Sequence, residues 1–260
     1  SEGVKDYSTY FSCDAQGHVR EQVINYKKLR RLFPALTARA EVKKIEFQYN
    51  NITGKVTRMY YQPKQADRFI HWYTYDADGR MVALHTGTNP YEMESLRDCD
   101  ALYKFYQHGP LARIELGTEK IQGLDYAYTL NGWLKGINGG TTGGDNDMGA
   151  DGNEGSHGTF ARDIFGEVLN YFPDDYQSIA GSGASRFYPD LSSSELAGDF
   201  SKPLYNGFIQ NSVSVINFDS LLPMNRSIGR AYRYDQANRF TEMKMLFNPG
   251  VNTALIADYN

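Results

Sequence analysis

The sequence predicts an all-β protein built from repeated β-hairpins, and three observations lead to this fold class. A short unit, aromatic-x-aromatic-Asp-x-x-Gly-x-apolar, recurs along the chain with fixed internal offsets. The chain holds 20 Tyr and 14 Phe but only 2 Trp, and tyrosine suits half-buried strand positions. Asp followed three residues later by Gly is turn chemistry. A repeated unit decides the architecture because each copy is one element that stacks on its neighbours.

The unit is clearest where Tyr73, Tyr75, Asp76 and Gly79 are followed by Met81. Two aromatic residues two positions apart point to the same face of a strand. The Asp side chain bonds backbone groups ahead of it, and Gly takes the positive φ that other residues resist. Met81 then begins the return strand, so the unit predicts a hairpin with an aromatic outgoing strand.

Six further segments fit the same frame, some of them loosely. Their turn positions are Gly17, Gly54, Gly109, Gly132, Gly166 and Asn238. The other residues assigned to the structural repeat are Tyr126, Tyr128, Asp163, Tyr232, Tyr234 and Asp235. Asn in a glycine slot agrees with this assignment because Asn tolerates the left-handed region. The copy at Gly54 has one extra residue before its turn, which suggests a bulge, and a degenerate copy is expected around residues 205–209.

Three loop insertions interrupt the repeat near residues 86–101, 138–158 and 173–203. The first could be a strand or a short helix, and the third reads as an outer loop. The second is rich in Gly and acidic residues and favours a mobile surface loop. Its alternative is a calcium loop, whose ligands would be Asp145, Asp147, Asp151 and Glu154. The ligand spacing departs from that of an EF-hand.

Composition and motifs point away from several functional classes. The net charge is −4, and no basic face is apparent that would predict a nucleic-acid partner. The sequence has no run of about 18 apolar residues, so no membrane span is predicted. Zinc-protease, CxxC and nucleophile-elbow motifs are absent from the sequence. We therefore predict no enzyme activity, no catalytic residues, no cofactor and no metal, and no binding residues can be assigned.

Two copies of the repeated unit resemble the repeats of the YD-repeat, or Rhs (rearrangement hot spot), family. They are Tyr75-Asp76 with Gly79-Arg80, and Tyr234-Asp235 with Asn238-Arg239. Segments 123–135 and 160–172 are similar to segments of Rhs proteins from Bacteroidota, and the resemblance covers about residues 5–250. The resemblance implies a curved, spiralling antiparallel sheet that forms part of a hollow shell, in a protein that is secreted or at the bacterial cell surface.

The resemblance also implies partners and a role. The partners would be the remainder of a longer polypeptide and an encapsulated toxin domain, secretion machinery or a surface protein. The sequence lacks the Asp-Pro-x-Gly-Leu plug motif of toxin-carrying members, since Gly123-Leu124 has no Asp-Pro before it. The expected role is a structural wall segment; the alternative is an extracellular module that binds a glycan or surface protein through exposed tyrosines.

The whole chain, 1–260, is interpreted as a single YD-repeat segment. It begins with Ser1 rather than Met and stops within a strand-like segment, 257–260, so we expect a fragment of a longer protein. Such a segment should have open edges, and the edge strands are expected at 19–29 and 243–247.

Overall fold

The computed structural model describes residues 7–26, 33, 41–140, 148–152, 158–177, 200, 202–216, 226–247 and 254–259. The fold in these residues is all-β, as the repeat predicts, and almost no helix is present. The chain divides into two compact units, Ser1–Tyr103 (unit 1) and Lys104–Asn260 (unit 2). No helix in the described part of the chain is long and apolar enough to cross a membrane.

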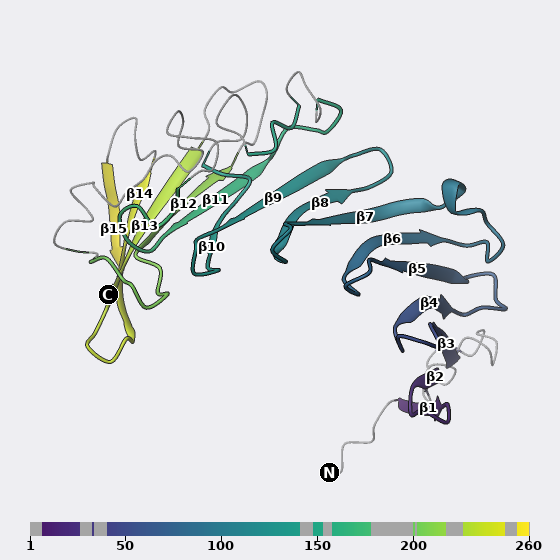
Figure 1. Cartoon of the computed structure of the whole chain (residues 1–260). Helices are drawn as coiled ribbons and strands as arrows, with labels where there is room; N and C mark the ends of the chain where they lie inside the picture. Colours follow the sequence, from purple (N-terminus) through teal and green to yellow (C-terminus); the bar gives the residue numbers. More distant parts are fainter. Residues whose placement is uncertain are drawn as a thin grey trace, which may run out of the picture. The chain divides into compact units, whose positions relative to one another are not determined.

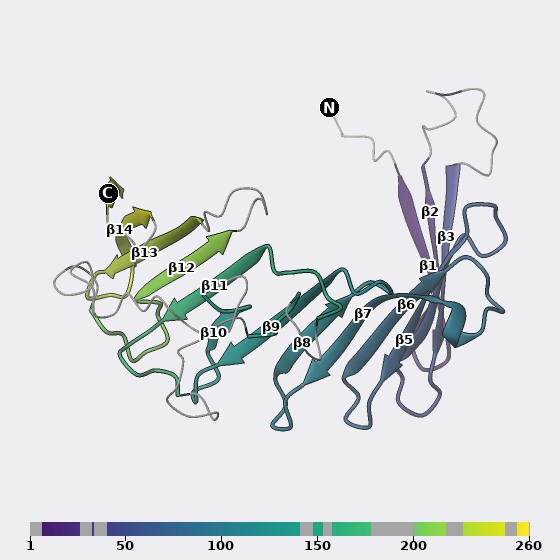
Figure 2. The ribbon, with the colours of Figure 1, turned by 90° about the horizontal axis from the view of Figure 1, so that it is seen from above.

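Unit 1 is a sheet of consecutive antiparallel hairpins, in which each strand pairs with the next one along the chain (Figures 1 and 2). Its strands are β1 (Ser8–Cys13), β2 (Val19–Asn25), β3 (Val42–Tyr49), β4 (Val56–Tyr61), β5 (Phe69–Tyr75), β6 (Met81–Gly87) and β7 (Asp98–Phe105), whose last two residues belong to unit 2. The insertion at 86–101 contains both candidate structures, because the short 3₁₀ helix η2 (Glu94–Leu96) is followed by the start of β7.

Unit 2 repeats this arrangement, and its strands also pair in chain order (Figure 1). They are β8 (Leu111–Leu116), β9 (Gln122–Tyr128), β10 (Leu134–Ile137), β11 (Phe165–Asn170), β12 (Asn211–Ile216), β13 (Arg226–Tyr234), β14 (Phe240–Phe247) and β15 (Ala254–Tyr259). Its apolar core joins Ala127, Val168, Val213 and Val215, with Met148 packed against them.

The predicted hairpin turns are confirmed at six of seven positions. The residues with positive φ include Gly17, Gly54, Gly79, Gly109, Gly132 and Asn238. The degenerate copy also has its turn, since Gly207 has a φ of 88° and β12 follows it. Some of these turns, such as those at Gly109 and Gly132, have no Asp three residues earlier. The feature that the turns share is therefore a Gly or Asn with positive φ.

The predicted turn at Gly166 is wrong. Gly166 lies inside β11 and is paired with Val215. Its lack of a side chain serves a close approach instead, because a Cβ there would lie 2.4 Å from the carbonyl oxygen of Gly139. A glycine required by packing and a glycine required by a turn look the same in a sequence.

The bulges also differ from expectation. In five hairpins the pairing skips the second residue of the return strand; the skipped residues are Arg20, Thr57, Val82, Lys135 and Thr241. The extra residue before Gly54 makes the turn longer and forms no bulge of its own. The bulge in that hairpin lies at Thr57, the same position as in the other four hairpins. A residue skipped by the pairing is free of the ladder, so its side chain can be redirected.

The predicted edge strands are wrong as well. β2 pairs with both β1 and β3, and β14 pairs with both β13 and β15. In the described residues, β1 and β15 are each paired on one side only.

Candidate functional site

The turn aspartates hold the hairpins locally. In the turn between β13 and β14, Asp235 Oδ1 accepts hydrogen bonds from the backbone N–H groups of Ala237 and Arg239, both at 2.9 Å. Its Oδ2 accepts from Arg239 Nε at 2.7 Å. Asp76 is bound in the same way by the backbone N–H and Nε of Arg80, each at 2.8 Å. The Asp-x-x-Gly-Arg unit is therefore a turn closed by one carboxylate and neutralised by one guanidinium.

A second repeated contact joins each of four hairpins to the preceding one. The tyrosine before the turn donates its hydroxyl hydrogen to the carbonyl oxygen of the first residue of the preceding return strand or, in one hairpin, of a residue two positions before that strand. The pairs are Tyr49 to Val19 at 2.8 Å, Tyr75 to Val56 at 2.9 Å, Tyr171 to Leu134 at 2.8 Å and Tyr234 to Ile209 at 3.1 Å. The acceptor always lies two residues after a residue with positive φ.

These tyrosine contacts are independent of loop length. Donor and acceptor are 19 residues apart for Tyr75 and 37 apart for Tyr171. Tyr171 reaches the acceptor even though its own turn glycine, Gly207, follows an insertion. Burial raises the pKa of the Tyr75, Tyr171 and Tyr234 hydroxyls, which agrees with rings packed between hairpins rather than standing in water.

The other repeat tyrosines are half-buried strand residues. They are Tyr73, Tyr126, Tyr128 and Tyr232. Burial raises the pKa of Tyr73 and Tyr128, the hydroxyl of Tyr232 lies 3.1 Å from Ser212 Oγ, and the carbonyl of Tyr126 accepts from Tyr106. Asp163, in contrast, is buried outside any hairpin turn and accepts from Gln122 Nε2.

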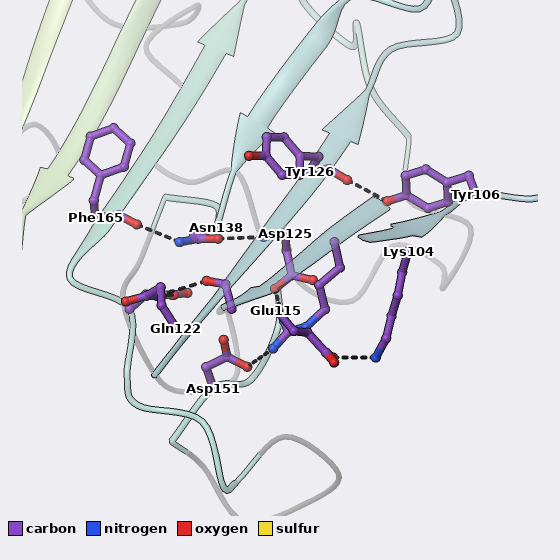
Figure 3. Close-up of polar contacts among 12 residues, drawn as sticks. Lys104, Tyr106, Glu115, Gln122, Asp125, Tyr126, Asn138, Asp151 and Phe165 are labelled. Carbon is purple, nitrogen blue, oxygen red and sulfur yellow. Dashed lines mark hydrogen bonds and ion pairs between the residues drawn. The ribbon is translucent and has the colours of Figure 1, made fainter. Parts of the chain in front are cut away.

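Unit 2 contains a buried ionic cluster centred on Arg113, and Figure 3 labels its acidic members Glu115, Asp125 and Asp151. The Arg113 side chain is only 5% exposed. Its guanidinium binds Glu115 Oε1 at 3.2 Å, Asp151 Oδ1 at 2.7 Å and the carboxylate of Asp125. Burial alone would lower the pKa of Arg113, but the hydrogen bond to Asp151 and the surrounding carboxylates raise it. The cluster thus links Arg113 in β8 to Asp151, which lies in the segment between β10 and β11.

Glycines make this cluster sterically possible. A Cβ at Gly123 would lie 2.1 Å from both Arg113 Nη2 and Asp151 Oδ2, and a Cβ at Gly149 would lie 2.3 Å from Asp125 Oδ2. Such distances are far below van der Waals contact. Both positions therefore require glycine so that the charged groups can approach each other.

The interpretation of residues 138–158 as a mobile surface loop is wrong for the described residues 148–152. Asp151 is fully buried, and Met148 packs against the core. Of the calcium ligands considered, Asp145, Asp147 and Glu154 lie outside the described residues, and Asp151 is bound by Arg113. Within the described part of the chain, no group of three or more His, Cys, Asp or Glu side chains is arranged to hold a metal ion.

Asn138 joins two strands where β10 ends (Figure 3). Its side-chain oxygen accepts from the backbone N–H of Asp125 at 2.7 Å, and its Nδ2 donates to the carbonyl of Phe165 at 3.0 Å. The residue is fully buried and has a φ of 57°. The side-chain amide of Asn138 thus links β9 to β11 just beyond the end of β10.

A second buried polar cluster lies around Lys135. Its Nζ lies 2.5 Å from both Asn170 Oδ1 and Asp175 Oδ1, and Asn170 Nδ2 donates to Asn211 Oδ1 at 2.6 Å. The sequence reasoning missed both clusters. One signal was available for each: Arg113-x-Glu115 places two opposite charges on one strand face, and Lys135 occupies the bulge position of its hairpin.

No protein-family model matches this chain, and no curated protein matches its sequence. The fold and its contacts define an antiparallel sheet of repeated hairpins, in which turn aspartates and inter-hairpin tyrosines stabilise the repeat.

Proposed function

We propose that this chain is a structural wall segment of a YD-repeat (Rhs-type) β-shell, which encloses or presents a toxin or surface domain and has no chemistry of its own. The proposal includes a secreted or cell-surface location and the remainder of a longer polypeptide as the direct partner. The observation that carries it is the tyrosine-to-carbonyl contact. Four hairpins use it in the same register, so the repeat residues serve the connection between hairpins.

Burial of the repeat residues also supports a wall. The repeat tyrosines are half-buried, and the hydroxyls of Tyr75, Tyr232 and Tyr234 make contacts within the sheet. A row of tyrosines that binds ligands would instead expose its rings. Buried charges are paired with one another, as at Arg113 and Asp151. These features stabilise a sheet and leave few repeat side chains to recognise a ligand.

The test is limited proteolysis of the complete native polypeptide that contains this chain. A wall that encloses a domain should protect that domain, so it should be cut at least tenfold more slowly than the same domain produced alone. Equal cleavage rates would contradict enclosure.

A second candidate function is glycan binding, which one observation favours. Tyr205 is 71% exposed and stacks on Phe172, with ring centroids 4.6 Å apart and an interplanar angle of 27°. Exposed aromatic faces bind sugars by stacking. Glycan-array binding that is lost in Tyr205→Ala and kept in Tyr75→Phe would support this function, and no binding by the wild-type protein would contradict it.

A further inference from the structure

The contacts of Lys135 place an amine, a carboxamide and a carboxylate together in a buried position of unit 2. The Lys135 and Asp175 side chains are 6% and 4% exposed, and Asn170 is 2% exposed. Lys135 Nζ lies 2.5 Å from Asn170 Oδ1 and 2.5 Å from Asp175 Oδ1. The Asn170 carbonyl carbon is one C=O bond of about 1.23 Å from Oδ1. The amine is therefore within about 3.7 Å of that carbon, close to the separation from which bonds form.

We propose that Lys135 and Asn170 form an intramolecular isopeptide bond, with Asp175 as the proton carrier. The bond would covalently join β10 to β11 across the connection at residues 138–164. This proposal is independent of the proposed function, because it concerns how the strands are linked and not what the sheet encloses.

The arrangement around the three groups fits this reaction. An ammonium and a carboxylate are costly to bury, and transfer of one proton from Lys135 to Asp175 makes both neutral. The neutral amine is the nucleophile that attack on an amide requires. Asp175 is held in place because its Oδ2 accepts from the backbone N–H of Tyr171 at 2.9 Å.

The departing group is held as well. Asn170 Nδ2 donates to Asn211 Oδ1 at 2.6 Å, which fixes the plane of the amide with its oxygen toward Lys135. Asn211 is fully buried, and its own Nδ2 has no hydrogen-bond partner among the residues that the structure describes. An unsatisfied buried amide is costly. We therefore assign Asn211 the role of orienting the Asn170 amide.

The reaction is balanced without an oxidant or a reductant. The lone pair of Lys135 Nζ forms a bond to Asn170 Cγ, and the bond between Cγ and Nδ2 breaks with its electron pair leaving on nitrogen. Asp175, protonated by the first transfer, gives its proton to the departing nitrogen and takes one from the attacking nitrogen, so it ends the reaction protonated. The products are a secondary amide and one molecule of ammonia.

The first test is the intact mass and tryptic map of the wild-type protein. We expect a mass lower than the sequence mass by one ammonia. Trypsin should not cut after Lys135, so residues 121–162 should be recovered in one branched species with residues 163–186. Loss of ammonia by succinimide formation at Asn-Gly sites would leave cleavage after Lys135 intact, so the map separates the two reactions.

Variants identify the roles of the three groups. Lys135→Arg keeps a positive charge but cannot form the bond, and Asp175→Asn keeps the shape but cannot carry the proton. Both should have the full sequence mass of the variant, and Lys104→Arg, a matched change at a lysine whose side chain is 54% exposed, should still lose one ammonia. A wild-type protein with the full sequence mass and normal cleavage after Lys135 would overturn the proposal, even if a variant failed to fold.

Discussion

The hydroxyl of Tyr75 donates a hydrogen bond to the carbonyl oxygen of Val56 at 2.9 Å, and this contact joins one hairpin to the hairpin before it. Val56 begins a return strand, and Tyr75 ends the next outgoing strand. The same relationship in four hairpins means that stability should depend on the hydroxyl groups, and not only on the rings.

Tyr75→Phe should lower the free energy of unfolding by about 1 kcal/mol, because the ring remains and one hydrogen bond is lost. Tyr91→Phe is the matched control, since Tyr91 is 92% exposed, and it should change the free energy by less than about 0.5 kcal/mol. Urea denaturation followed by circular dichroism measures both. Equal effects of the two variants would show that the hydroxyl of Tyr75 contributes nothing.

Arg113→Met should destabilise unit 2 by about 3–5 kcal/mol, because it leaves the carboxylates of Asp125 and Asp151 buried without their cation. Lys43→Met removes one cation from an ion pair with the half-exposed Asp67 and should cost less than about 1 kcal/mol. Thermal unfolding of the two variants provides the comparison. A small loss in Arg113→Met would mean that the cluster is open to water.

Gly166 and Gly132 should respond differently to substitution. Gly166→Ala places a Cβ against the Gly139 carbonyl and should cost about 1–3 kcal/mol by overpacking. Gly132 has a φ of 79° and open space around it, so alanine there should cost about 1–2 kcal/mol from backbone strain alone. Asparagine tolerates positive φ. Gly132→Asn should therefore be milder than Gly132→Ala, whereas Gly166→Asn should be no milder than Gly166→Ala; denaturation of all four variants would reveal any departure from this pattern.

Acid should weaken the hairpin turns. The backbone N–H of Arg239, followed by its side chain, lowers the pKa of Asp235. The unfolded chain therefore binds a proton at this residue at a higher pH than the folded chain does. This contribution to stability is present above the ordinary Asp pKa of about 4 and is lost as the pH falls through the lowered folded pKa. Asp235→Asn should show a smaller loss of stability on acidification than the wild type, and identical pH profiles would contradict this account.

The hairpin turns could be predicted from the sequence because each turn depends on residues only a few positions apart. Asp76 and Gly79 are three residues apart and determine a turn between them, and the same local pattern predicts six of the seven turns correctly. Gly166 was misplaced because its role depends on Gly139, which approaches from another segment. The tyrosines were assigned to strands, but their carbonyl acceptors follow from the pairing register.

The polar clusters were missed for the same physical reason. Arg113 and Asp151 are 38 residues apart, and the spacing of charges along the chain does not show which of them meet. A glycine-rich, acidic segment usually remains in solvent. The burial of Asp151 depends on its contact with Arg113 and on the space left by Gly123 and Gly149, and neither can be read from the segment itself.

The most direct test of the proposed wall is a cryo-electron microscopy map of the complete polypeptide that contains this chain. The account predicts that the hairpins form part of a shell around an enclosed domain, and that further hairpins pair with the outer edges of β1 and β15. A map in which both faces of the sheet and both edge strands lie in solvent would contradict it.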